Sequence, residues 1–452
     1  MKITDHIETT ANLLSQQGIR KLVNEVSNVN LRDIGGQFWM DQHQILSKLN
    51  IQAHLQVQTE SKEIAYEELL NQNKIVNVLH HLLSIEVWKN KIYPNFSSDT
   101  TFKEKNEFKL YFLLYHEATA INLLELLLYH PKGLNSLGEN ILDLIDYCNK
   151  KLRILNAWDE DVVSRFEKLD FQKSEVSKMD LKKNRSELEF SISINSLSIF
   201  RYLTENILNL SLTCQTRIIN EYDFISHLVF LIEKAPWLKT KVEKNAKVFE
   251  KFDNGVWKMV DKEELFLIGK VEAQVWLSLY NLLIEPECQK KYNYNTKNHE
   301  IVLRLRTYMS EDLLNQLPIL EGLYRFLEQL SMMDPPVQEF GDSKVLIQQI
   351  PDLTLSILEG ADFKEISHHQ KTIFECESAA AKEKFTEGLA NIYNIDDLET
   401  FLEDPKCAKC GQLATQRCSR CKLEWYCSRP CQVKSWGNHK ETCSIIVGDV
   451  EK

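Results

Sequence analysis

Glycine and proline are scarce in this chain, which has only 14 glycines and 10 prolines among its 452 residues. This scarcity disfavours strand-rich sandwiches and long disordered linkers, because both need frequent turns. We therefore expect a mostly helical protein. A chain of this length can also bury a large apolar core.

No segment resembles a secretory signal or a membrane span. The first ten residues contain acids, and no apolar run with a small-residue cleavage site follows them. The most apolar stretch, residues 110–129, contains His116, Glu117 and Glu125, which a lipid-facing helix does not readily carry. We expect that stretch to be a buried core helix.

Motifs typical of enzymes are also missing. The sequence has no glycine-rich phosphate loop, no nucleophile elbow and no His-Glu-x-x-His. Its histidine pairs, His80–His81 and His368–His369, are adjacent, so on a helix the two side chains diverge and cannot chelate one ion together. We expect these four histidines to be surface or partly buried residues, and we expect no enzymatic activity.

Cysteine is sparse until residue 407 and then abundant. Four of the 11 cysteines are scattered singly, at positions 148, 214, 288 and 376, and the other seven lie within residues 407–443. With one histidine they follow the spacing C-x2-C-x7-C-x2-C-x5-C-x3-C-x7-H-x3-C, formed by Cys407, Cys410, Cys418, Cys421, Cys427, Cys431, His439 and Cys443. Eight such ligands complete two closed tetrahedral zinc sites, which are structural because no position is open to substrate. Clustered thiols of this kind indicate a reducing cytosol or nucleus.

The spacing leaves two ligand pairings open. In a sequential scheme the first four cysteines share one zinc. In an interleaved scheme the first pair joins Cys427 and Cys431, and the remaining ligands form the second site. Either scheme gives one site of four cysteines and one of three cysteines and a histidine.

Charge argues against binding to nucleic acid. The chain has a formal net charge of −11, although residues 407–443 carry seven lysines and arginines against two glutamates. Thiolates contribute negative charge that outweighs the charge of two zinc ions, so the loaded segment is only weakly basic. We therefore expect no nucleic acid partner.

Apolar residues recur at helical spacing before the cysteine-rich segment. They predict helices near residues 69–88, 121–128, 141–155, 188–210, 224–232, 271–283, 301–309 and 314–332, and in stretches between 363 and 401. Such helices pack as bundles or stacked pairs, so we expect an all-α armadillo- or HEAT-like array. Asp253-Asn254-Gly255 between two apolar segments predicts one small β-hairpin.

We infer the domain boundaries from helix-breaking residues and from stretches rich in charge. We expect a helical scaffold over residues 1–402, a possible charged insert at 159–187, a linker at 333–342 and a zinc module at 407–443. Pro405 stops the preceding helix just before the first cysteine.

The cysteine-rich segment resembles a MYND zinc finger, with every ligand and the Tyr-Cys, Cys-Gln and Trp landmarks in place over about 37 residues. The resemblance implies the interleaved pairing, and it implies that Ser419, Gln432 and Trp436 contact short, often proline-containing peptides. Gln432 and Trp436 are four residues apart and so share a helical face. The alternative is that Trp436 is simply the apolar plug of a module too small for a core.

Most of the chain resembles the family of MYND-containing axonemal dynein assembly factors. The similarity includes Leu31-Arg-Asp-Ile34, Trp88-Lys-Asn-Lys91, His116-Glu-Ala118 and the segment from Gln274 to Leu283. It implies a co-chaperone for dynein arms of motile cilia, located in the cytoplasm and near centriolar satellites. Implied partners are a leucine-rich-repeat dynein assembly factor, an immunophilin co-chaperone, heat-shock chaperones and the axonemal dynein chains.

Two rival functions deserve comparison. Some lysine methyltransferases embed a MYND finger inside a SET domain, but here the finger is terminal and the body lacks a SET-like strand pattern. A nuclear adaptor or corepressor that recruits proline-containing peptides is the stronger alternative.

Overall fold

The computed structural model divides the chain into two compact units, Met1–Cys376 and Glu377–Lys452. It describes residues 14–97, 100–158, 177–243, 246–253, 255–332, 350–375 and 407–447, with gaps at 411, 413, 415 and 420–424. The predicted boundary between 402 and 407, the predicted linker and residues 159–176 of the predicted insert lie outside the described residues. The rest of that insert is helical, at the start of α10.

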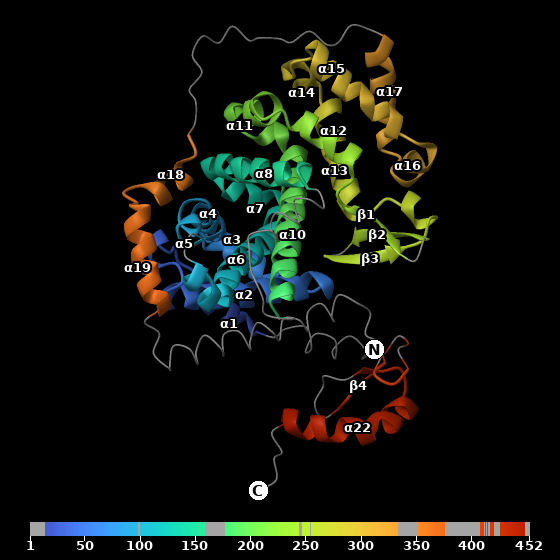
Figure 1. The fold of residues 1–452 in the computed structure, drawn as a ribbon. Helices are drawn as coiled ribbons and strands as arrows, with labels where there is room; N and C mark the ends of the chain where they lie inside the picture. The colour runs from blue at the N-terminus through green and yellow to red at the C-terminus, as the bar shows by residue number, and fades with distance from the viewer. Residues whose placement is uncertain are drawn as a thin grey trace. The chain divides into compact units, whose positions relative to one another are not determined.

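The first unit is built from sets of three helices, in which a short helix separates two longer ones (Figure 1). The sets are α2 (Gln37–Gln58), α3 (Ile64–Asn71), α4 (Ile75–Lys91); α6 (Thr100–Tyr129), α7 (Pro131–Ser136), α8 (Ile141–Asn156); α10 (Ser177–Glu205), α11 (Leu212–Thr216), α12 (Phe224–Lys234); and α13 (Lys270–Ile284), α14 (Pro286–Lys291), α15 (Thr296–Leu303).

The first helices of successive sets form one layer. Helix α2 packs on α6, α6 on α10, α10 on α13, and α13 on α17 (Leu320–Met332), while α4, α8 and α12 pack against this layer. Hydrogen bonds between neighbouring sets join residues a nearly constant distance apart in sequence: Asn122 with Asn50 (72 residues) and Arg217 with Asp146 (71 residues). The sets therefore stack in parallel. The mostly helical prediction is confirmed, and the armadillo or HEAT class stays a prediction.

The last helices of the unit return to its beginning. Helices α18 (Asp352–Leu358) and α19 (Phe363–Glu375) lie beside α4 and α5 (Tyr93–Ser97) (Figure 1). The fully buried Gln370 accepts a hydrogen bond from Trp88 Nε1 (2.9 Å) and donates one to the Leu31 carbonyl (2.8 Å). One amide thus ties α19 to two segments near the N-terminus. Among the described residues, the remaining α-helices of the unit are α1 (Gln16–Glu25) and α16 (Glu311–Gln316).

The predicted hairpin is confirmed as β2 (Ala246–Asp253) paired with β3 (Val256–Val260), with Gly255 at a φ of 84° in the turn. A third strand, β1 (Leu238–Glu243), pairs with the other edge of β2. Strand β1 was not predicted from the sequence, because a contact between distant residues helps to stabilise it. This is a cation–π contact, in which Lys239 Nζ lies 3.5 Å from the Trp257 ring centroid.

Five charged side chains form an ion cluster inside the first unit: Glu86, Lys89, Glu117, Lys151 and Glu189. Lys151 Nζ lies 2.6 Å from Glu117 Oε1 and 2.7 Å from Glu189 Oε1, and Lys89 Nζ lies 2.6 Å from Glu117 Oε2. Burial opposes the charge of Lys151, yet the carboxylates around it raise its pKa well above the ordinary value. The cluster joins α4, α6, α8 and α10 at one point.

This cluster explains the polar residues of the apolar stretch at 110–129. The stretch lies in α6, as predicted, and Glu117 is fully buried because two lysines and the Tyr147 hydroxyl (2.8 Å) satisfy it. No helix among the described residues has the length and apolarity needed to cross a membrane.

A second group of buried polar side chains, His81, His116 and His43, is joined by successive hydrogen bonds. The Ser27 carbonyl accepts from His81 Nε2 (2.9 Å), so His81 Nδ1 accepts from His116 Nε2 (3.3 Å). His116 Nδ1 then accepts from His43 Nδ1 (2.7 Å), and His43 Nε2 accepts from the Ser47 hydroxyl (3.3 Å). One set of neutral tautomers satisfies every bond.

The prediction that His80 and His81 are surface or partly buried residues is wrong. They are 9% and 1% exposed, because α4 packs against both α6 and α18. His369 is partly buried and His368 is exposed, as predicted. Burial lowers the pKa of His81 to about 4, and burial together with the neighbouring imidazole of His81 lowers the pKa of His43 to about 3.

Acid should therefore destabilise the first unit. Unfolded histidines bind protons near pH 6.5, whereas the folded ones stay neutral until the pH falls to about 4, so stability is full above 6.5 and falls between these values. The shift of His81 alone corresponds to about 3 kcal/mol. Urea unfolding followed by circular dichroism from pH 7 to 4.5 measures this loss. His81→Gln should flatten the dependence and His368→Gln should not, while equal slopes for all three proteins would refute the assignment.

Candidate metal centre in the second unit

Backbone contacts bring the first cysteine turn beside a short strand. Strand β4 (Gln416–Arg417) pairs antiparallel with β5 (Trp425–Tyr426), and the Ala408 amide donates to the Trp425 carbonyl (2.9 Å). Helix α22 (Arg429–Val447) begins three residues after β5. The turn at Cys407–Cys410 thus lies beside the residues that lead into α22.

Four sulfur atoms meet at this point, those of Cys407, Cys410, Cys427 and Cys431. All lie within 4.8 Å of one another. Cys427 Sγ is 3.5 Å from both Cys410 Sγ and Cys431 Sγ. Zinc–sulfur bonds of about 2.3 Å in a tetrahedron place sulfurs about 3.8 Å apart. The four thiols therefore have the spacing that a tetrahedral zinc ion requires, and they are free cysteines.

The identity of the four cysteines that meet distinguishes between the two predicted ligand pairings. The sequential scheme requires Cys418 beside Cys407 and Cys410, whereas the observed group contains Cys427 and Cys431 instead. It is the group that the interleaved scheme expects.

The other four predicted ligands are described only in part. Cys418 and His439 are buried, at 1% and 2% exposure. Cys421 and the side chain of Cys443 lie outside the described residues. The imidazole of His439 meets the rings of Tyr426 and Trp436 edge to face, with centroids 6.3 and 5.9 Å apart. These aromatic contacts fix the plane of one predicted ligand.

The predicted peptide contacts are partly accessible. Ser419 is exposed, and Gln432 and Trp436 are half-buried one turn apart on α22. Trp436 also packs against the small core of Cys407, Ala414, Cys418 and Tyr426. The indole therefore supports the finger and is still partly exposed to solvent. The two predicted roles of Trp436, as apolar plug of the module and as peptide contact, are thus compatible.

Sequence reasoning missed Val433, which is 68% exposed beside Gln432. Within the described part of the second unit, it is the large apolar side chain most exposed to solvent. A lone valine between polar helix residues was the available signal. Val433 and Trp436 are three residues apart and so are neighbours on the helix surface.

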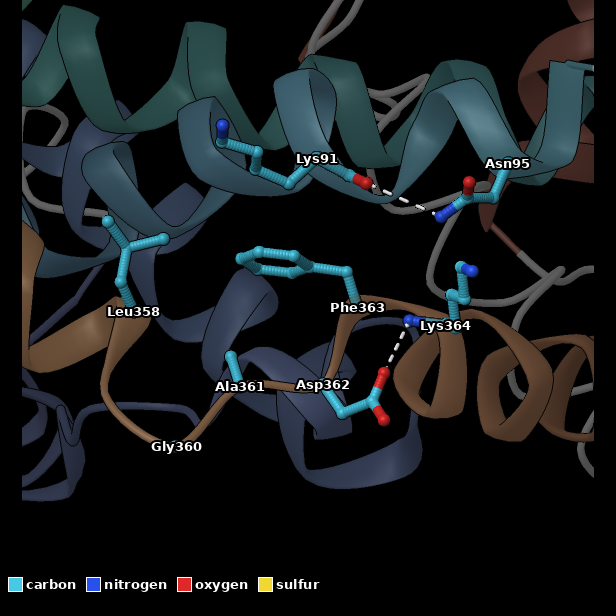
Figure 2. Close-up of a pocket in the computed structure, with 8 residues that line it drawn as sticks. All are labelled: Lys91, Asn95, Leu358, Gly360, Ala361, Asp362, Phe363 and Lys364. Atoms are coloured by element: carbon cyan, nitrogen blue, oxygen red, sulfur yellow. Dashed lines mark hydrogen bonds between the residues drawn. The ribbon is translucent and has the colours of Figure 1, made fainter.

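A surface hollow in the first unit offers fewer functional groups than the cysteine cluster. Figure 2 shows this hollow, in which Phe363, the first residue of α19, lies below the helical segment that carries Lys91 and Asn95. Asp362 Oδ1 accepts from the Lys364 amide (2.9 Å), and Asn95 Nδ2 donates to the Lys91 carbonyl (3.4 Å). These polar groups hold local backbone, and we assign no catalytic role to them.

Comparisons with known proteins agree with this geometry. Residues 407–443 match the MYND finger family. The chain is 26% identical over 458 residues to the zinc finger MYND domain-containing protein 10 homolog of Drosophila melanogaster. The aligned region covers 96% of this chain and 99% of that relative. No solved structure matches.

Two shorter similarities involve larger proteins. Tudor domain-containing protein 1 of Mus musculus is 29% identical over 79 residues, 17% of this chain and 7% of that relative. A SET and MYND domain-containing protein of Dictyostelium discoideum is 55% identical over 31 residues, 7% of this chain and 6% of that relative. Of these three similarities, the one to the Drosophila protein extends over both units, so the chain contains a segment that matches the MYND finger family and is similar to that Drosophila protein along nearly its entire length.

Proposed function

We propose that the chain is a non-enzymatic scaffold and co-chaperone for the pre-assembly of axonemal dynein arms. The observation that carries this proposal is the similarity over 96% of the chain to a MYND finger protein, since a shared finger alone would match only a short segment. Because the helical body resembles dynein assembly factors, we propose axonemal dynein chains as the client proteins. A stacked helical body also presents long surfaces, which suits a protein that holds several partners.

We further propose that the finger holds two structural zinc ions. Cys407, Cys410, Cys427 and Cys431 would bind the first, and the second would take Cys418, Cys421, His439 and Cys443. Zinc supplies here only the bonds that hold a module with too few apolar residues for a core of its own. The chain's part is to place the ligands, through the contact of Ala408 with Trp425 and the start of α22.

The exposed face of α22 is proposed to bind a short peptide. Gln432 offers an amide that can donate to and accept from an extended backbone, while Val433 and the edge of Trp436 offer apolar contact. The leucine-rich-repeat assembly factor is the partner proposed for this face. The immunophilin co-chaperone, heat-shock chaperones and dynein chains are proposed as further partners of the whole chain, in the cytoplasm and around centriolar satellites.

Replacing Gln432 and Trp436 together with alanine should weaken capture of that assembly factor by at least about tenfold, since a hydrogen-bonding amide and an aromatic anchor are lost. Because Trp436 also packs in the finger, Gln432→Ala with Val433→Ser serves as a second variant that leaves the core intact. Lys434→Ala, exposed on the same helix, is the matched control. Isothermal titration would measure the affinities, and unchanged binding by both double variants would move recognition to another surface.

The alternative, a nuclear corepressor that recruits proline-containing peptides, draws on the finger alone. Localisation of the tagged chain in ciliating cells separates the two functions. A SET-type methyltransferase is less favoured, because the similarity to the SET and MYND protein covers only 6% of that relative. A methyl-transfer assay on the purified chain tests it.

The proposed function is tested by removing the chain from multiciliated cells. Axonemes should then retain their microtubules and lack outer and inner dynein arms in electron micrographs. Axonemes with a full set of arms would contradict the proposal.

A further inference from the structure

A second hollow in the first unit contains one deeply placed histidine. It is formed by His80 from α4 and by two segments far apart in sequence, within residues 29–33 and 356–366. Gln370 Nε2 donates to the Leu31 carbonyl (2.8 Å), which helps to hold the two segments together. The cavity has a volume of about 310 Å³, at the lower end of the range for small-ligand sites. We name it the His80 pocket.

The His80 imidazole has a nitrogen atom that the fold does not use. Its Nδ1 lies 3.3 Å from Ser84 Oγ, whereas Nε2 has no hydrogen-bond partner among the described residues. The residue is nevertheless only 9% exposed, and it lines the pocket. Polar groups buried to this degree are normally hydrogen-bonded, so the free Nε2 points to a ligand.

The ring is also neutral at physiological pH, because burial lowers the pKa of His80 to about 4. A neutral imidazole does not repel a cation. In the tautomer in which Nδ1–H donates to the Ser84 hydroxyl, Nε2 is an acceptor for an N–H group of the ligand.

Carboxylates dominate the charge around the pocket. The charged residues that line it are Arg32, Asp33, Glu359, Asp362 and Glu365. Arg32 Nη2 pairs with Glu365 Oε1 at 3.2 Å, which leaves three carboxylates without a cation among the described residues. One of them, Asp362, also lines the hollow of Figure 2. The pocket therefore favours a positively charged ligand.

The ligand should be longer than a metal ion. Within the described parts of the chain, the four finger cysteines are the one set of three or more metal-ligand atoms that lie within 4.8 Å of one another. The carboxylates and the imidazole of the pocket are thus too far apart to coordinate one ion together. Buried apolar side chains also line the pocket, those of Val29, Leu31, Ile357 and Ile366. A cation on an alkyl stem matches both kinds of lining.

We propose that the His80 pocket binds an arginine side chain from a basic segment of a partner protein. The alkyl stem would pack on the apolar residues, and the guanidinium would donate to His80 Nε2 and to the unpaired carboxylates. Five N–H donors in a planar fork can reach several separated acceptors, whereas a lysine ammonium is a compact point charge. The formal net charge of −11 on the whole chain also favours a basic partner.

The test uses the full-length, zinc-loaded chain with isotope-labelled histidine, and N-acetyl-arginine methylamide as the probe. The probe should shift the ring signals of His80 with a dissociation constant of about 1 mM, as expected for a single side chain. The citrulline derivative has nearly the same shape and no charge, so it should bind at least about tenfold more weakly. The lysine derivative should bind several-fold more weakly, since it lacks the fork.

Matched variants locate the binding. Asp33→Asn with Glu359→Gln removes two exposed, unpaired carboxylates and should weaken binding about fivefold without unfolding the chain. Glu263→Gln with Asp312→Asn removes two exposed acids outside the pocket and should bind like the natural chain. His80→Leu should weaken binding about tenfold. Isothermal titration at high probe concentration measures these affinities, and thermal unfolding checks each fold.

The pocket belongs to the first unit, so binding there is independent of the finger. The finger variant Gln432→Ala with Val433→Ser should keep full affinity for the probe, which separates this proposal from the proposed function. An unchanged His80 signal at about 10 mM probe would overturn the proposal, as would equal affinity for the citrulline derivative or undiminished binding by the folded Asp33→Asn, Glu359→Gln chain. A dimer of the natural chain that this last variant loses would also overturn it, because a second copy would then be the occupant.

Discussion

Replacing Lys151 with methionine is expected to lower the unfolding free energy of the first unit by about 3–5 kcal/mol, the usual loss when one partner of a buried ion pair is removed. Lys151 is 1% exposed and lies within 2.7 Å of oxygens from Glu117 and Glu189. Methionine fills a similar volume, so the loss reports on charge. Without Lys151, the carboxylates of Glu117 and Glu189 would share the ammonium of Lys89.

Lys150 provides a matched control at the next position on α8. Its side chain is 52% exposed and its Nζ lies 3.7 Å from Glu86 Oε1. Because water reaches the Lys150 side chain and screens its charge, this longer ion pair contributes little, and Lys150→Met should lower stability by about 1 kcal/mol or less. Adding Glu117→Gln to Lys151→Met should restore part of the loss by removing an unpaired charge. Equal effects of the two lysine changes in urea unfolding would contradict the ion cluster as described.

Replacing Cys427 with serine should have the second large effect, on metal content and on the folding of the finger. Natural protein should contain about two zinc ions per chain, as eight tetrahedral ligands allow. Zinc binding contributes roughly 10–16 kcal/mol to the folding of finger peptides, so loss of one ligand should unfold residues near the first site. Elemental analysis measures the zinc, and hydrogen exchange locates the unfolding.

Cys288, buried in the first unit, provides the control for cysteine loss. Cys288→Ala should keep both zinc ions and protection of the finger from exchange. One zinc or none in undamaged natural protein, or two in Cys427→Ser, would refute the proposed ligand set.

Local sequence signals predicted the elements that local forces determine. The apolar periodicity at residues 141–155 predicted α8 almost to its ends, and Asn254-Gly255 located the hairpin. The prediction of one helix over 314–332 is wrong, because Pro318 cannot donate the backbone bond that would continue it. Helix α16 ends at Gln316 and α17 begins at Leu320.

Groups assembled from distant helices could not be predicted in this way. Glu86, Glu117, Lys151 and Glu189 come from four helices, and each alone suggests a solvated surface charge. The same holds for His43, His81 and His116. By contrast, Cys407, Cys410, Cys427 and Cys431 were recognisable as ligands because short-range spacing carries the information, although only the fold shows which of them meet.

Quantitative affinity purification from ciliating cells tests most directly whether the chain is a dynein assembly scaffold with a peptide-binding finger. The intact chain and a chain ending at Pro405 would be compared in parallel. The intact chain should recover axonemal dynein heavy chains with heat-shock chaperones, and the shorter chain should lose the leucine-rich-repeat assembly factor. Recovery of chromatin proteins without any dynein chain would contradict this function.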